Sequence, residues 1–100
     1  MRKKTEDRIK CLLREELCRQ AANIAEIITY EQLKAHNVDP EAIIINTEVS
    51  NCCFTIYLYL GSYDFEVAHY HSEDALWVIT NQNKVRSRID EELVKFLSKK

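Results

Sequence analysis

Apolar side chains recur every three or four positions from residue 5 to residue 28, which predicts one long amphipathic helix at the start of the chain. Thr5 stands where an N-terminal capping residue is expected. The stretch Thr29-Tyr30-Glu31-Gln32 then has the pattern of a capping box, with Ile28 and Leu33 placed to make the hydrophobic contact around it. We therefore expect a second, short helix that begins at this capping box and ends at His36-Asn37.

The spacing of the apolar residues changes to a period of two after Ala42. The segments 42–49 and 52–60 are rich in β-branched and aromatic residues, which predicts two strands. Gly61-Ser62 follows the second strand directly and is typical of a two-residue hairpin turn. Ser50-Asn51 occupies the equivalent position between the first two strands. The sequence therefore predicts three consecutive antiparallel strands.

Two tight turns determine which residues face each other across the strands. The expected pairs are Leu60–Tyr63, Leu58–Phe65, Ile56–Val67 and Phe54–His69 in one hairpin, and Val49–Cys52, Ile45–Ile56 and Ile43–Leu58 in the other. Both hairpins then place the apolar side chains on the same face of the sheet. A shift by one residue would turn this whole set to the other face, so the agreement supports the predicted register.

Residues 75–80 allow two interpretations. Their sequence suits a fourth strand, which we favour, but the preceding Ser72-Glu73-Asp74 also resembles a helix start. Residues 84–98 have apolar side chains at helical spacing and predict a final helix. The sequence thus predicts one domain, residues 1–100, of the α+β class. In this two-layer fold an antiparallel meander of three to four strands carries the N-terminal and C-terminal helices on one face.

The face of the sheet that the helices leave open is the expected functional surface. It carries tyrosines and acidic residues, and tyrosine is favoured at protein interfaces because it combines a large contact area with a hydroxyl. Aromatic residues are also common in strands that have no binding role. The residues that we expect to form a binding surface are Ile44, Glu48, Tyr57, Tyr59, Asp64, Glu66 and Tyr70.

Positive charge is distributed unevenly along the chain, although the net charge is only −2. Residues 1–34 hold eight Lys or Arg, residues 84–100 hold the other six, and residues 35–83 hold none. The predicted sheet is therefore acidic, which favours a partner with a basic surface and argues against nucleic acid. We expect a small non-enzymatic protein-binding module, of the kind found among inhibitors, immunity proteins and accessory proteins of phages or mobile elements.

Two alternatives remain open. Three consecutive isoleucines, Ile43 to Ile45, would form an apolar sheet edge or face, so we also expect a homodimer that covers them. The order of helix, strands and helix is similar to that of the double-stranded RNA-binding domain, which implies weak binding of nucleic acid. That function would depend on basic residues near the two ends of the chain, namely Arg2, Lys3, Lys4, Arg8, Arg86 and Arg88.

Catalysis and cofactor binding have little support. The single glycine excludes a Gly-rich phosphate loop, and no serine has the context of a nucleophile elbow, so we expect no enzymatic activity and no cofactor. We also expect no metal. Cys52, His69 and His71 share one face in the expected register and are zinc-type ligands, but a fourth ligand is missing. In the simpler interpretation the two histidines close the open end of the core.

No segment predicts membrane insertion or secretion. The longest stretch without charge, between Val49 and Asp64, contains polar residues and is shorter than the roughly 20 apolar residues of a membrane span. The residues after Met1 are charged and lack the apolar core of a signal peptide. We therefore expect a cytoplasmic protein with reduced cysteines.

Overall fold

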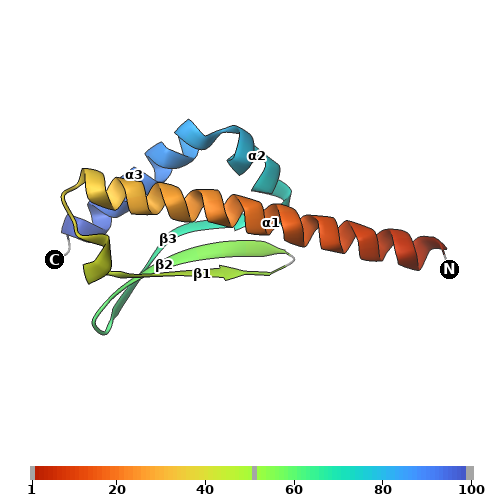
Figure 1. Ribbon diagram of the computed structural model, residues 1–100, viewed down its shortest axis with the longest axis horizontal. Helices are drawn as coiled ribbons and strands as arrows, with labels where there is room; N and C mark the ends of the chain where they lie inside the picture. Colours follow the sequence, from red (N-terminus) through yellow and green to blue (C-terminus); the bar gives the residue numbers. More distant parts are fainter. Residues whose placement is uncertain (1, 51, 99–100) are drawn as a thin grey trace.

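A computed structural model describes residues 2–50 and 52–98, with side chains from residue 8 onward except at positions 11 and 40. The strands β1 (Ile44–Val49), β2 (Cys53–Leu60) and β3 (Tyr63–His71) form an antiparallel sheet in this order. The helices are α1 (Arg2–Ala35), α2 (Ala75–Thr80) and α3 (Gln82–Ser98), with short 3-10 turns at Pro40–Ala42 and Ser72–Asp74. All three helices lie on one side of the sheet (Figure 1), which confirms the expected α+β architecture.

Helix α1 runs without a break through the position where we expected a second helix to begin. The hydroxyl of Thr29 donates to the carbonyl oxygen of Ala25 at 2.8 Å, so this side chain bonds back along the helix and does not act as a cap. Thr29 and Leu33 are both fully buried and extend the apolar face of α1. The prediction of a second helix was wrong because a buried threonine can satisfy its hydroxyl inside a continuous helix. The helix also begins at Arg2, ahead of the expected cap Thr5.

The C-terminal end of α1 lies close to the expected position. Asn37 has a left-handed backbone conformation, with a φ of 61°. The backbone N–H of Asn37 donates to the carbonyl oxygen of Lys34 at 2.9 Å. The backbone N–H of Val38 donates to the carbonyl oxygen of Leu33 at 3.0 Å. These two bonds form a Schellman motif, which satisfies the last carbonyl groups and ends the helix.

Residues 75–80 form helix α2, so the fourth strand was wrong and the alternative helical interpretation is the one observed. Ala75 and Val78 are both fully buried, and this spacing of three residues fits one face of a helix. Leu76, between them, is 59% exposed. The short apolar run was ambiguous because six residues are too few to separate a strand from a buried helical turn by period alone.

The hairpin between β2 and β3 follows the expected register only near its turn. Leu60 pairs with Tyr63 and Leu58 with Phe65, as predicted. A bulge then places Val67 between the partners of Tyr57 and Ile56, so that Ile56 faces Ala68 and not Val67. The expected pairs are wrong beyond this point, and the later pairs are Thr55–His69, Phe54–Tyr70 and Cys53–His71.

The hairpin between β1 and β2 is shifted by two residues from the predicted register. Ile45 pairs with Leu58 and not with Ile56, and Val49 pairs with Phe54 and not with Cys52. The Ser50 hydroxyl accepts hydrogen bonds from the backbone N–H groups of Cys52, at 3.3 Å, and Cys53, at 3.2 Å. These bonds form a longer turn than the expected two-residue turn at Ser50-Asn51. Because a shift of two preserves the alternation of side chains, the predicted faces of β1 remain correct.

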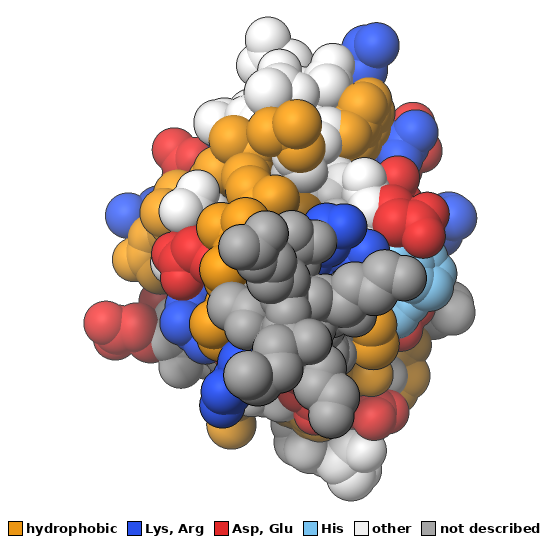
Figure 2. Space-filling model, turned by 90° about the vertical axis from the view of Figure 1, so that its right-hand side faces the viewer, with side chains coloured by type: hydrophobic (Ala, Val, Ile, Leu, Met, Phe, Trp, Pro, Cys, Tyr) orange, Lys and Arg blue, Asp and Glu red, His pale blue; other side chains and the backbone are white. Residues whose placement is uncertain are grey.

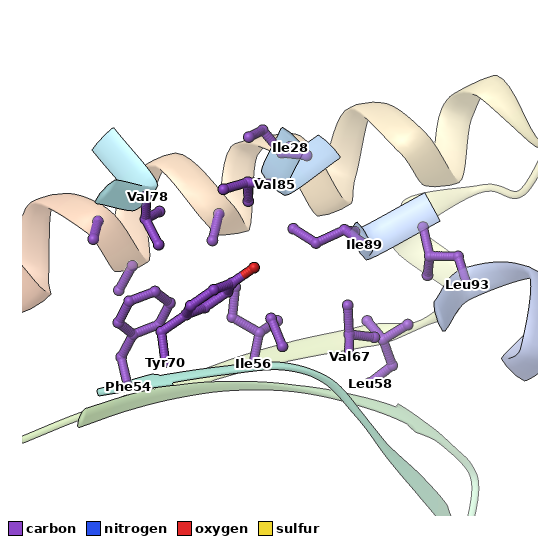
Figure 3. Close-up of a cluster of buried hydrophobic side chains, with 14 of the residues drawn as sticks. Ile28, Phe54, Ile56, Leu58, Val67, Tyr70, Val78, Val85, Ile89 and Leu93 are labelled. Carbon is purple, nitrogen blue, oxygen red and sulfur yellow. The ribbon is translucent and has the colours of Figure 1, made fainter. Parts of the chain in front are cut away.

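The core lies between the sheet and the helices. Figure 3 shows strand side chains pointing toward the helices and meeting side chains from α1, α2 and α3. The labelled strand residues are Phe54, Ile56, Leu58, Val67 and Tyr70, and the labelled helical residues are Ile28, Val78, Val85, Ile89 and Leu93. Since this core occupies one face of the sheet, the opposite face is free to present polar and aromatic side chains.

A polar cluster joins the C-terminal part of α1 to α3. Asp90 Oδ1 accepts a hydrogen bond from Gln32 Nε2 at 2.9 Å and lies 2.7 Å from His36 Nε2. Arg86 donates to the Gln32 side-chain oxygen at 2.8 Å. The hydrogen bonds from Gln32 and His36 hold the pKa of Asp90 below its ordinary value. The charged carboxylate is therefore the form that the folded protein favours.

Asp90→Asn should consequently change how stability depends on pH. The pKa of Asp90 in the folded protein lies below the unfolded value of about 3.9, so its stabilisation is complete at neutral pH and is lost in more acidic solution. Because this side chain is 38% exposed, we expect a loss of only about 0.5–1 kcal/mol at pH 6. Urea unfolding of the wild type and of Asp90→Asn at pH 6 and at pH 2.5 measures this difference in the free energy of unfolding, which should be smaller at pH 2.5. An equal difference at both pH values would contradict the prediction.

None of the helices in the described part of the chain combines the length and the apolar character needed to cross a membrane.

Candidate interaction surface

The open face of the sheet gathers side chains from all three strands. Cross-strand pairing and alternation place on it Ile44, Asn46 and Glu48 of β1, Cys53, Thr55, Tyr57 and Tyr59 of β2, and Asp64, Glu66, His69 and His71 of β3. Of these, Ile44 is 68% exposed. Among the described residues, the helices all lie on the other side of the sheet (Figure 1). This face is therefore available to a partner.

Two tyrosines form the centre of this face. Tyr57 lies on the middle strand between Asn46 of β1 and Glu66 of β3. The neighbouring Tyr59 pairs with Ile44 on one side and with Asp64 on the other. The two rings are tilted by 36° with their centroids 6.2 Å apart, and both side chains are half-buried. Partly buried rings with free outer surfaces are suited to anchor a protein partner.

Acidic side chains surround the two rings. Partial burial, and then the negative charges of Glu48 and Glu66, raise the pKa of Tyr57 above its ordinary value. The phenol of Tyr57 is protonated at neutral pH, as an ordinary tyrosine is, and can donate a hydrogen bond to a partner. Among the described residues, no ion pair with Lys or Arg joins Glu48, Asp64 or Glu66. We call Ile44, Glu48, Tyr57, Tyr59, Asp64 and Glu66 the tyrosine face.

Tyr70 does not belong to the tyrosine face, so its expected position was wrong. It is only 9% exposed, and its ring stacks on Phe54 with the centroids 5.5 Å apart. Ala68, which uninterrupted alternation would also place on the open face, is buried as well. The cause is the bulge at Val67, which adds one residue to β3 and reverses the side-chain alternation beyond it.

The same bulge brings two histidines onto the open face. His69 and His71 do not close the core, as we had expected, but are exposed, with their rings edge to face and the centroids 5.2 Å apart. His69 Nδ1 lies 2.8 Å from the hydroxyl of Thr55. The partner of His71 across the strands is Cys53, and not Cys52, with which His71 shared a face in the expected register. The sequence does not reveal this arrangement, because it depends on where the bulge lies.

Cys52, in the turn between β1 and β2, was the third candidate zinc ligand beside the two histidines. Cys52 Sγ lies 3.3 Å from the hydroxyl of Ser50, and hydrogen bonds with Ser50 and then Cys53 lower the pKa of Cys52. Burial raises the pKa of Cys18, which is fully buried. Within the ranges that the structure describes, no group of three or more His, Cys, Asp or Glu side chains is placed to hold a metal ion.

The acidic surface continues around the edge of β3. A shallow hollow of about 350 Å³ lies between β3 and α3, with Glu66 and His69 on one wall and Arg88, Glu91 and Glu92 on the other. Arg88 lies over the ring of Trp77, 4.7 Å from its centroid. Sequence analysis missed this hollow because it joins two segments that are distant in the chain. A basic side chain of a partner would fit the three carboxylates that line it.

No protein family, no curated protein and no solved structure matches this chain.

Proposed function

We propose that this chain is a non-enzymatic binding protein whose tyrosine face docks on a basic surface of another protein. The observation that carries the proposal is that Tyr57 and Tyr59 pair with Glu66 and Asp64 of β3, while Glu48 of β1 also acts on Tyr57. The rings offer apolar contact area and hydroxyl donors, while Glu48, Asp64 and Glu66 attract Lys and Arg.

The charge distribution supports a protein partner over nucleic acid. Residues 35–83 include the whole sheet and contain no Lys or Arg. Nucleic-acid affinity comes largely from neutralisation of phosphates by such residues, so the tyrosine face would repel a nucleic-acid backbone. A labelled RNA duplex is a suitable probe. Binding at about 150 mM salt that depends on Tyr57 would contradict this part of the proposal.

The partner can be identified by a comparison of baits. Affinity capture from the native cell is carried out with the wild-type chain, with Tyr57→Ala/Tyr59→Ala, and with Leu76→Ala as a matched control. Leu76 is 59% exposed on α2, away from the tyrosine face. Proteins that the wild type and the control retain, and the double variant loses, are the candidates. A partner that all three baits retain equally, or one with an acidic surface, would contradict the proposal.

Neutralising the acids should mainly slow association with the purified partner. In the triple variant Glu48→Gln/Asp64→Asn/Glu66→Gln we expect the association rate at low salt to fall about tenfold, with the dissociation rate changed much less. The reason is that charges at the rim of an interface steer the approach of the partner more than they hold it. Surface plasmon resonance at several salt concentrations measures both rates. A salt dependence as steep as that of the wild type would contradict the role of these three acids.

A further inference from the structure

The N-terminal part of α1 extends past the end of the sheet and past α2 and α3 (Figure 1). At 1.5 Å per residue the 34 residues of α1 span about 51 Å, whereas the nine residues of the longest strand span about 30 Å. The first buried side chain among the described residues of α1 is that of Cys18. Isolated helices shorter than about 12–15 residues are marginally stable in water, so a partner that packs on these turns would stabilise them.

Large apolar side chains are exposed at both ends of α1. Ile9, Leu12 and Leu13 are 51%, 61% and 58% exposed in the projecting part, and Ile27 and Tyr30 are 60% and 43% exposed above the sheet. We call these five residues the outer face of α1. Figure 2 shows the side of the molecule that lies on the right in Figure 1, where hydrophobic side chains reach the surface beside charged ones.

All five residues lie on the side of α1 that points away from the core. Ile9 and Ile27 are each nine residues from the buried Cys18, which is two and a half helical turns. Ile9 and Ile27 are therefore five full turns apart on one line along the helix, and Leu12 and Tyr30 are related in the same way. The two apolar clusters thus form one interrupted stripe.

One pair of opposite charges lies beside the two clusters. Arg8 stands next to Ile9 of the N-terminal cluster, and Glu26, five full turns later on the same line of the helix, stands next to Ile27 of the C-terminal cluster. If a second α1 runs antiparallel, with Ile9 beside Ile27 of the other copy, Arg8 comes within about one helical turn of Glu26 of that copy on the same flank of the contact. A parallel pair would instead place like charges beside each other. Charge complementarity therefore selects the antiparallel arrangement and a second copy of this chain as the occupant.

We propose that two copies of this protein associate through the outer faces of their α1 helices, running antiparallel. This two-fold contact covers both apolar clusters of each copy and supports the projecting turns. Because α1 lies on the covered side of the sheet (Figure 1) and these residues point away from the core, the contact leaves the tyrosine faces of both copies free. The dimer expected from the isoleucines of β1 would instead cover Ile44 and block one side of the tyrosine face.

The mass in solution tests the proposal with the purified chain alone. In analytical ultracentrifugation at about 100 µM we expect the wild type to sediment as a dimer of the 11.8 kDa chain. Leu13→Glu and Ile27→Glu should each weaken the dimer by about a hundredfold or more, because each changes two buried side chains per dimer. Leu76→Glu makes the same chemical change at an exposed position of α2 and should leave the dimer intact. Thermal unfolding confirms that each variant is folded.

Charge reversal tests the antiparallel orientation. Arg8→Glu and Glu26→Arg should each weaken the dimer by about tenfold, and the double variant should return to within about threefold of the wild type. In a parallel dimer each of these positions would face the same position of the other copy, so neither the single nor the double charge reversal would change the affinity appreciably.

Three results would overturn the proposal. The first is a monomeric wild type at all concentrations up to about 500 µM, far above the dissociation constant expected for such a contact. The second is a folded Ile27→Glu variant that dimerises like the wild type. The third is dissociation by Ile44→Glu or by Tyr57→Ala/Tyr59→Ala alone, which would place the contact on the sheet. Because these tests need no partner protein, their failure is separate from failure of the proposed binding function.

Discussion

Tyr57→Ala/Tyr59→Ala is expected to weaken binding of the partner protein by about a thousandfold. Aromatic anchors at the centre of an interface commonly contribute about 2 kcal/mol or more each, and most of the loss arises from faster dissociation. Tyr57 and Tyr59 have that central position, since both lie on the middle strand with side chains of β1 and β3 on either side. Isothermal titration calorimetry with the purified partner measures the change.

The double variant needs two checks. Both tyrosines are half-buried on the face opposite the core, so its thermal unfolding should remain cooperative. Leu76→Ala removes a comparable exposed side chain outside the tyrosine face and should bind like the wild type. A folded double variant with unchanged affinity would mean that the partner binds elsewhere, and the acidic hollow between β3 and α3 would be the next surface to test.

Ile56→Ala is expected to lower the free energy of unfolding by about 2–5 kcal/mol, a large part of the stability of a chain of this size. Ile56 is fully buried beneath the helices, and Figure 3 shows its side chain pointing into the core. The cost comes from lost apolar contact and from the cavity that remains. Tyr57→Ala, one residue later on the other face, should cost the isolated chain about 1 kcal/mol or less. Urea unfolding of both variants measures the difference. Equal losses would show that the two faces had been assigned incorrectly.

The sequence predicts the faces of the sheet well wherever alternation is uninterrupted. Ile44, Glu48, Tyr57, Tyr59, Asp64 and Glu66 all lie together on the uncovered face, as the period of two indicates. The two-residue shift between β1 and β2 leaves this result unchanged, because it preserves the parity of the positions. Pattern alone therefore locates the tyrosine face, while its role as a binding surface stays a prediction.

The bulge at Val67 marks the limit of this reasoning. Val67 and Ala68 are both buried, and each residue after them points to the opposite side from the one that strict alternation predicts. Tyr70 consequently packs in the core, while His69 lies on the open face. A bulge has no clear sequence signal of its own, because it depends on how the strand fits under α3.

The helical errors have a different physical origin. Thr29 carries a pattern that is common at helix starts, but its burial against the sheet decides that the helix continues. The alternative interpretations of Ala75–Thr80 are likewise separated only by the packing of Ala75 and Val78 in the core. Local sequence limits the possibilities at both places, and tertiary contacts select among them.

The central claim is that the tyrosine face is the surface that binds the partner. Two-dimensional NMR of the isotope-labelled chain, titrated with the purified partner, tests it most directly because each backbone amide reports separately. We expect the largest shift changes on β2 at Tyr57 and Tyr59, with smaller changes at the neighbouring residues Glu48 and Glu66. Changes confined to α1 or α3, with the amides of Tyr57 and Tyr59 unaffected, would contradict the account.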